Sequence, residues 1–175
     1  IALRLVGSEM CIRDRLAVLG DTIVCTGADA GAPPRTGPQG PMSVSIYSAH
    51  KGTLVRNLHG HARDVRCVAL DGDIVASGDC DGVVRLWDLA SGAELAVFRD
   101  HKAAVYGLAV RSGLVASGSE DHTVRPWSTA THARVAVHAG HTAPVMSVAL
   151  SETCVLSTSE DGTTMAWPLF EGGQR

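Results

Sequence analysis

The sequence predicts an all-β fold of about four repeated units, each a four-stranded antiparallel sheet. A His, a Ser, an Asp and a Trp recur together at a fixed interval of 40 residues. Inside each unit the apolar residues alternate with the period of two that is typical of β-strands, and no stretch has a helical period. Repeats of this length form stacked or radially arranged sheets. We therefore expect a partial β-propeller whose ring is not closed.

The elements of one unit can be placed in order along residues 61–100. Val68 and Leu70 alternate in the first strand, and Val65 breaks the alternation three positions earlier, which indicates a bulge near the start of the strand. The turns that follow are rich in Asp and Gly, as at Asp81-Gly82. The second, third and fourth strands are expected at 74–77, 83–87 and 94–98. Four antiparallel strands in about 40 residues are the layout of one propeller blade.

Three units carry the recurring side chains with identical spacing: sixteen residues from His to Ser, four from Ser to Asp and six from Asp to Trp. These twelve residues are His61, Ser77, Asp81, Trp87, His101, Ser117, Asp121, Trp127, His141, Ser157, Asp161 and Trp167. Together with the dipeptides Gly60-His61, Ser77-Gly78 and Trp87-Asp88, they resemble the repeats of the WD-repeat family. The resemblance covers roughly residues 16–170.

The resemblance implies that the four side chains of each unit form a buried hydrogen-bond chain, from the Trp ring N–H through Ser and His to Asp. Such a chain gives the indole donor a partner inside the core. A Ser/His/Asp hydrolase is the alternative, but a catalytic Ser needs an accessible oxygen. Here the set occurs three times, and its Ser lies in a short apolar strand. We therefore interpret the tetrads as structural, expect no catalytic residue, and keep the hydrolase as the less favoured alternative.

Two places depart from the repeat. In the first unit, Thr26-Gly27 takes the place of Ser77-Gly78, Tyr47 takes that of Trp87, and a stretch rich in Pro and Gly at 30–41 intervenes. This stretch has too little apolar surface to fold, so we expect a loop.

The second departure is Pro126, which replaces the Leu86 of the preceding unit. Because proline has no N–H to give to a β-ladder, it predicts an interrupted third strand in that blade.

The ends of the chain set the expected domain organisation. Residues 5–15 resemble a translated sequencing-library adapter, so residues 1–15 are set apart from the fold; a basic N-terminal arm is the alternative. The rest is expected to be an incomplete first blade (16–60), two full WD repeats (61–100 and 101–140), a last repeat without its fourth strand (141–170) and a tail (171–175). We expect this array to be a fragment of a larger ring.

Composition narrows the class of function. The formal net charge is −3, from 15 basic and 18 acidic residues, which offers no basic surface for nucleic acid. No apolar run approaches the ~20 residues of a membrane helix. The cysteines share no repeat position and no C-x-x-C spacing, so we expect reduced thiols in a cytoplasmic or nuclear protein, with no metal and no cofactor.

The function expected from the resemblance is a non-catalytic interaction scaffold whose partners are other proteins or peptide segments, a basic segment being one candidate. In WD-repeat proteins the contact positions lie three and five residues after the His and one before the Asp. In this chain these are Asp64, Arg66, Cys80, Ala104, Tyr106, Glu120, Pro144, Met146 and Glu160. The alternative is the substrate-recognition propeller of an F-box ubiquitin ligase, which often reads phosphorylated segments through clustered Arg.

Overall fold

A computed structural model describes residues 16–26 and 42–169. All regular structure in these residues is β-strand, arranged in four antiparallel sheets of three or four strands. The predicted fold class is therefore confirmed. The expectations for residues 1–15, for the loop at 30–41 and for the tail at 171–175 lie outside the described residues.

Each sheet is a meander of consecutive strands, here called a blade. Blade 1 contains β1 (Leu16–Leu19), β2 (Thr22–Thr26), β3 (Ser43–Ser48) and β4 (Thr53–His59). Blade 2 contains β5 (Val65–Asp71), β6 (Ile74–Asp79), β7 (Val84–Asp88) and β8 (Glu94–Phe98). Blade 3 contains β9 (Val105–Arg111), β10 (Leu114–Ser119), β11 (Thr123–Ser128) and β12 (His138–Ala139). Blade 4 contains β13 (Val145–Leu150), β14 (Cys154–Ser159) and β15 (Thr164–Pro168).

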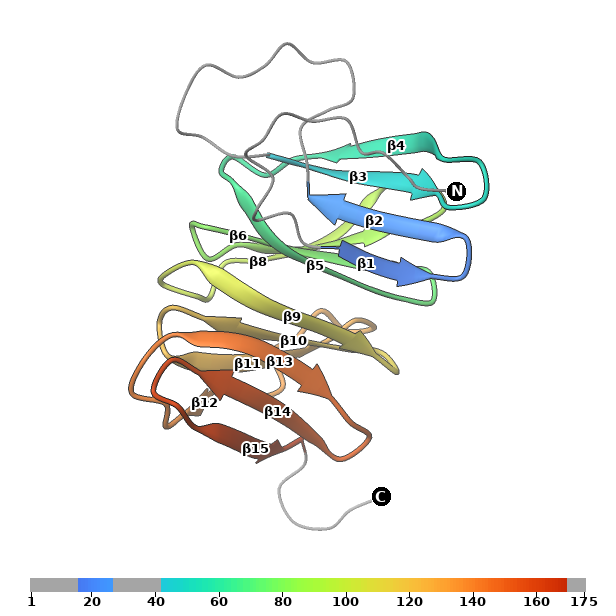
Figure 1. Cartoon of the computed structure of the whole chain (residues 1–175). Helices are drawn as coiled ribbons and strands as arrows, with labels where there is room; N and C mark the ends of the chain where they lie inside the picture. Colours follow the sequence, from blue (N-terminus) through green and yellow to red (C-terminus); the bar gives the residue numbers. More distant parts are fainter. Residues whose placement is uncertain (1–15, 27–41, 170–175) are drawn as a thin grey trace.

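The four blades follow one another in chain order, so that blades 1 and 4 lie at opposite ends of an open array (Figure 1). The first strands of successive blades, β1, β5, β9 and β13, contact one another. The predicted bulges are present near the start of β5, β9 and β13, at Val65, Val105 and Val145. A bulge increases the local twist of its strand.

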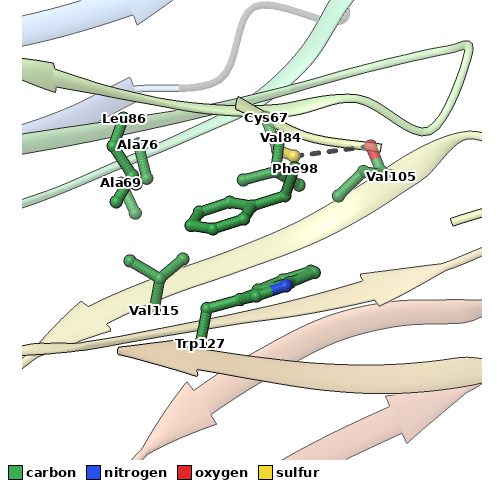
Figure 2. Close-up of a cluster of buried hydrophobic side chains, with 9 residues drawn as sticks. All are labelled: Cys67, Ala69, Ala76, Val84, Leu86, Phe98, Val105, Val115 and Trp127. Atoms are coloured by element: carbon green, nitrogen blue, oxygen red, sulfur yellow. Dashed lines mark hydrogen bonds between the residues drawn. The ribbon is translucent and has the colours of Figure 1, made fainter. Parts of the chain in front are cut away.

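The hydrophobic core lies between blades rather than inside them. At the junction of blades 2 and 3, small or compact side chains such as Ala76 and Leu86 meet Val115 and the ring of Trp127, and Phe98 stacks on that ring at 4.9 Å (Figure 2). Gly78 allows the close approach, because a Cβ there would lie 2.8 Å from a methyl carbon of Val105. The core therefore forms only when two blades are side by side.

The first blade is in a different register from the one we expected. Trp87 pairs with Val75, two residues before Ser77, whereas Tyr47 pairs with Ile23, two residues before Cys25. Cys25 thus occupies the Ser position of the first blade, and the prediction that Thr26-Gly27 does so was wrong by one residue. The prediction relied on the similarity of Thr26-Gly27 to Ser77-Gly78, and such a similarity does not fix the register of a strand. The register is set by which side chains of the strand face the core.

The prediction for Pro126 was also wrong, because the interruption lies in the fourth strand of the blade and not in the third. β11 runs unbroken through Pro126, which pairs with Ala116 of β10. The carbonyl of Pro126 accepts a hydrogen bond from Val135 N at 2.8 Å, on the side of the fourth strand. The N–H that proline lacks would point to the same side. The cost therefore falls on the fourth strand, since β12 has only two residues where β8 has five.

Replacing Pro126 with Leu should extend β12 and raise the melting temperature. Leu fits the position, because Leu86 is fully buried at the equivalent place in blade 2. One regained ladder bond is worth about 1 kcal/mol, or roughly 2–4 °C in a chain of this size. Differential scanning calorimetry measures the shift, and Leu86→Pro is the reciprocal control, which should lower the melting temperature. An unchanged or lower value for Pro126→Leu would contradict this explanation of the short β12.

Candidate partner-binding face and the tetrads beneath it

The tetrad of blade 2 forms a continuous buried chain, but through Asp79 rather than Asp81. Trp87 Nε1 donates to Ser77 Oγ at 2.8 Å, and His61 Nε2 lies 2.7 Å from the same oxygen. His61 Nδ1 lies 2.7 Å from Asp79 Oδ2. The predicted Asp81 instead lies at the surface, where Arg63 Nε donates to it at 3.3 Å.

Asp79 takes this place because it closes the turn after β6 as well as binding the His. Its second oxygen accepts the backbone N–H groups of Asp81 at 3.0 Å and Val83 at 2.9 Å. In blades 3 and 4 the equivalent residues are Ser119 and Ser159, whose hydroxyls accept the corresponding turn N–H. The sequence contained this signal, since only this unit has a carboxylate at both positions, two residues apart.

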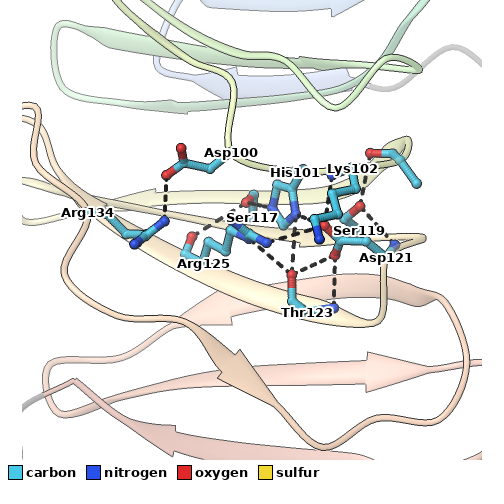
Figure 3. A network of polar contacts seen from close by, with 10 residues as sticks. Asp100, His101, Lys102, Ser117, Ser119, Asp121, Thr123, Arg125 and Arg134 are labelled. Carbon is cyan, nitrogen blue, oxygen red and sulfur yellow. Dashed lines mark hydrogen bonds and ion pairs between the residues drawn. The ribbon is translucent and has the colours of Figure 1, made fainter.

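The tetrad of blade 3 has the predicted Asp but lacks one link. His101 Nδ1 lies 2.8 Å from Asp121 Oδ2, and His101 Nε2 lies 2.6 Å from Ser117 Oγ (Figure 3). Thr123 and the backbone of Lys102 also donate to Asp121. The Nε1 of Trp127 is buried and has no hydrogen-bond partner among the described residues. The expected Trp–Ser bond is therefore absent in this blade.

Blade 4 has the complete predicted arrangement. Trp167 Nε1 donates to Ser157 Oγ at 2.7 Å, His141 Nε2 lies 2.8 Å from that oxygen, and His141 Nδ1 lies 3.1 Å from Asp161 Oδ2. The three serines are at most 1 % exposed. A hydroxyl that is buried and held by a His and, in two blades, by an indole cannot meet a substrate carbonyl, which argues against the hydrolase.

The carboxylates of the tetrads are held in their charged form. Burial favours the neutral acid at Asp79, but the hydrogen bonds from His61 and from the turn N–H groups outweigh it and lower the pKa. At Asp121 burial is likewise outweighed by His101 and Thr123, so the pKa falls well below its usual range. A lowered carboxyl pKa contributes stability above about pH 4, and this contribution is lost as the pH falls through the folded-state pKa.

Six of the nine predicted contact positions lie in loops that these tetrads hold together, and the other three, Arg66, Tyr106 and Met146, are the second residues of β5, β9 and β13. In each blade the backbone N–H just before the Asp position donates to the carbonyl three residues after the His: Cys80 to Asp64 at 3.0 Å, Glu120 to Ala104 at 2.9 Å and Glu160 to Pro144 at 3.0 Å. The two loops of a blade therefore form one edge. Ala104 is the exception to its predicted role, because its side chain is only 6 % exposed and offers little contact area.

Tyr106 lies on β9, the strand of blade 3 that contacts both β5 of blade 2 and β13 of blade 4. Its hydroxyl donates to Glu120 of the same blade at 3.3 Å. Burial raises the pKa of Tyr106, as do the charges of Glu120 and of Glu160 in blade 4, whereas the charge of Arg66 in blade 2 lowers it. Residues of neighbouring blades thus lie within electrostatic reach of one phenol. We call Arg66, Tyr106, Glu120, Met146 and Glu160 the rim.

The described residues offer no other obvious site. They contain no group of three or more His, Cys, Asp or Glu side chains placed to hold a metal ion. In the same residues no helix is long and apolar enough to cross a membrane. The rim, which is drawn from the predicted contact positions, is the candidate functional site.

Exchanging Asp79 for Asn should destabilise the chain far more than exchanging Asp81. Asp79→Asn leaves a turn N–H or His61 without its charged acceptor inside the core, at a cost of about 1–3 kcal/mol. Asp81→Asn removes only a surface ion pair and should stay within about 0.5 kcal/mol of the parent. Urea denaturation measures the free energy of unfolding of the two variants and of the parent. Equal losses would restore Asp81 to the tetrad.

Comparison with known proteins agrees with this geometry. The family profile described as "WD domain, G-beta repeat" matches residues 52–88, 92–128 and 133–167. A component of mouse chromatin assembly factor 1 is 38 % identical over 58 residues, which are 32 % of this chain and 10 % of that protein. "WD repeat-containing protein pop1" of Schizosaccharomyces pombe is 36 % identical over 62 residues, 35 % of this chain and 8 % of that protein. The chain thus spans a tenth or less of these relatives' length.

Solved structures show the same architecture over most of the chain. The computationally designed Ika4 protein superimposes with a TM-score of 0.76 at 28 % identity, covering 88 % of this chain and 89 % of that one. U3-55K gives a TM-score of 0.73 at 25 % identity, covering 93 % and 53 %. Since the profile matches more than half of the residues and the tetrads have the matching geometry, the chain belongs to the WD-repeat family.

Proposed function

We propose that this chain is a non-catalytic scaffold that holds a partner protein or peptide on the rim. The observation that supports this most directly is the position of Tyr106 on β9, between β5 of blade 2 and β13 of blade 4. Its hydroxyl donates a hydrogen bond to Glu120 of its own blade, and its pKa is affected by the charges of Arg66 and Glu160 in the blades on either side. Tyr, Arg and Met are the residue types that concentrate binding energy at interfaces, and all three are present in the rim.

The charges of the rim favour a basic segment of the partner. Glu120 and Glu160 are both exposed and both act on Tyr106. Neither forms an ion pair with a described residue. A Lys or Arg side chain placed between them would gain two carboxylates. Complementary charge of this kind steers encounter and fixes register more than it adds affinity.

The F-box alternative would require a different surface. Phosphate recognition depends on clustered Arg side chains, and Arg66 is the only basic residue among the nine contact positions. With two acidic residues around Tyr106, a phosphorylated segment would meet like charge. A basic partner segment therefore fits the rim better.

We further propose that the protein works inside the cell, in the cytoplasm or nucleus. Cys80 and Cys154 are free thiols, which persist where the compartment keeps cysteines reduced. The relative named for chromatin assembly supports a nuclear setting.

Reversing both rim carboxylates should abolish partner capture without unfolding the protein. In Glu120→Lys/Glu160→Lys, like charge would face the basic partner, and capture should fall at least about tenfold. Because both side chains are exposed, the stability should stay within about 0.5 kcal/mol of the parent. Affinity capture from cell extract followed by mass spectrometry measures the loss, and Tyr106→Ala/Arg66→Ala should give the same result.

A matched control places the same charge change at the opposite ends of the strands. Asp73 and Glu152 are exposed and lie in the turns between the first and second strands of blades 2 and 4. Asp73→Lys/Glu152→Lys alters the net charge equally and should keep every partner. If the control loses the partners and the rim variants keep them, the working face lies at the other end of the blades.

A further inference from the structure

One side chain of each outer strand packs on the Trp of the next blade. Leu58, Phe98 and His138 recur at the 40-residue interval and pair with equivalent valines, Val44, Val84 and Val124. Leu58 belongs to the buried cluster that contains Trp87. Phe98 stacks on Trp127 at 4.9 Å, and His138 stacks on Trp167 at 5.2 Å, each with an interplanar angle of 17°. Two blade junctions are thus closed by a hydrocarbon side chain, and the third is closed by a histidine.

The histidine is only partly buried, but the surroundings of one of its ring nitrogens suit the neutral form. Its Nε2 is buried and has no hydrogen-bond partner among the described residues. A neutral imidazole can leave one ring nitrogen unpaired at modest cost, whereas an imidazolium must place a charge and a second N–H there. Its strand, β12, has only two residues, so few backbone bonds hold the ring in place.

The surrounding elements offer no counter-ion to this ring. β15, which carries Trp167, has no charged side chain. The one charged residue of β11, Arg125, is engaged by Thr123 and Asp121. His141, in the loop before β13, is paired with Asp161 of the loop after β14, and the neighbouring carboxylates Glu152, after β13, and Glu160, after β14, are exposed to solvent. On the segment that leads into β12, Arg134 is paired with Asp100.

We propose that His138 makes the junction between blades 3 and 4 sensitive to acid, so that its protonation loosens the stack on Trp167. The two preceding junctions lack a titratable group at this position and do not respond in the same way. Because Glu160 and Met146 belong to blade 4 and Tyr106 to blade 3, loosening of this junction would also separate parts of the rim.

The direction of the effect follows from burial. Burial lowers the pKa of His138 from its ordinary value of about 6.5. The unfolded or opened chain therefore binds the proton more readily than the closed junction does. The contribution of the neutral ring to stability is complete above about pH 6.5 and is lost as the pH falls below it.

The test compares the parent with two variants that copy the other junctions, His138→Phe and His138→Leu. Thermal unfolding is followed at pH 7.5, 6.5 and 5.5. Between the first and last values, the parent should lose about 2–4 °C more than either variant. His59→Phe, at an exposed position on β4, is the control for the loss of any one histidine and should keep the parent's pH dependence.

Hydrogen exchange locates the effect. After correction for the intrinsic exchange rate at each pH, protection of β14 and β15 relative to β6 and β7 should fall about tenfold in the parent at acid pH. It should stay constant in the variants. Equal pH dependence in the parent and both variants would overturn the proposal. So would greater stability of the parent in acid, which would mean that the attraction between an imidazolium and the Trp167 face outweighs desolvation.

Discussion

The burial of one Trp ring at each blade junction is the constraint on which the rest of this structure depends. The ring supplies much of the apolar area between two sheets, but its N–H needs an acceptor inside the core. Ser77 and Ser157 provide that acceptor, and His61 and His141 hold the serines. Each series of hydrogen bonds ends on an Asp carboxylate that also accepts backbone N–H groups of a turn. The hydrogen bonding that the buried Trp requires thereby positions loops at the surface.

Those loops carry Glu120 and Glu160 of the rim, so the hydrogen-bond network that supports the core also holds these two residues. Lys102 N and Thr142 N both donate to the tetrad carboxylates of their blades. The next residues along these loops include the carbonyls that receive Glu120 N and Glu160 N. Hydrogen bonds that hold Glu120 and Glu160 in place before a partner binds would reduce the ordering cost of binding. Under the proposed function, a motif resembling a catalytic triad would serve recognition through the loops that it positions.

Blade 3 is where the chain departs most from its own repeat. Ser112, His122 and His132 adopt left-handed backbone angles at positions where blade 2 has Gly72, Gly82 and Gly92. Each such non-glycine residue costs roughly 1–2 kcal/mol. Pro126 and the unpaired Trp127 N–H add to the cost. Strain of this kind persists only where the surrounding structure compensates for it, and it often gathers near functional sites. Tyr106 and Glu120, at the centre of the rim, belong to this blade.

Periodicity predicted the fold because the 40-residue interval and the alternation within strands are direct consequences of the blade. It also predicted the bulges at Val65, Val105 and Val145 and two of the three tetrad carboxylates. Spacing could not distinguish Asp79 from Asp81, since the choice depends on which carboxylate can also accept the turn N–H groups. Nor could it show on which side of β11 the missing donor of Pro126 would fall. Both outcomes are set by the directions in which groups point, which a linear pattern does not record.

The same reasoning explains why the blade junctions are not equivalent. A buried Trp tolerates Leu, Phe or His above it, because each presents a flat or compact apolar surface at the required distance. The 40-residue repeat predicts only that a side chain of this shape lies at the position. It does not distinguish an imidazole from a hydrocarbon side chain. One nitrogen of the His138 imidazole, Nε2, matters because it is buried and has no hydrogen-bond partner among the described residues. A His at this position thus introduces a proton equilibrium at the junction that supports one side of the rim.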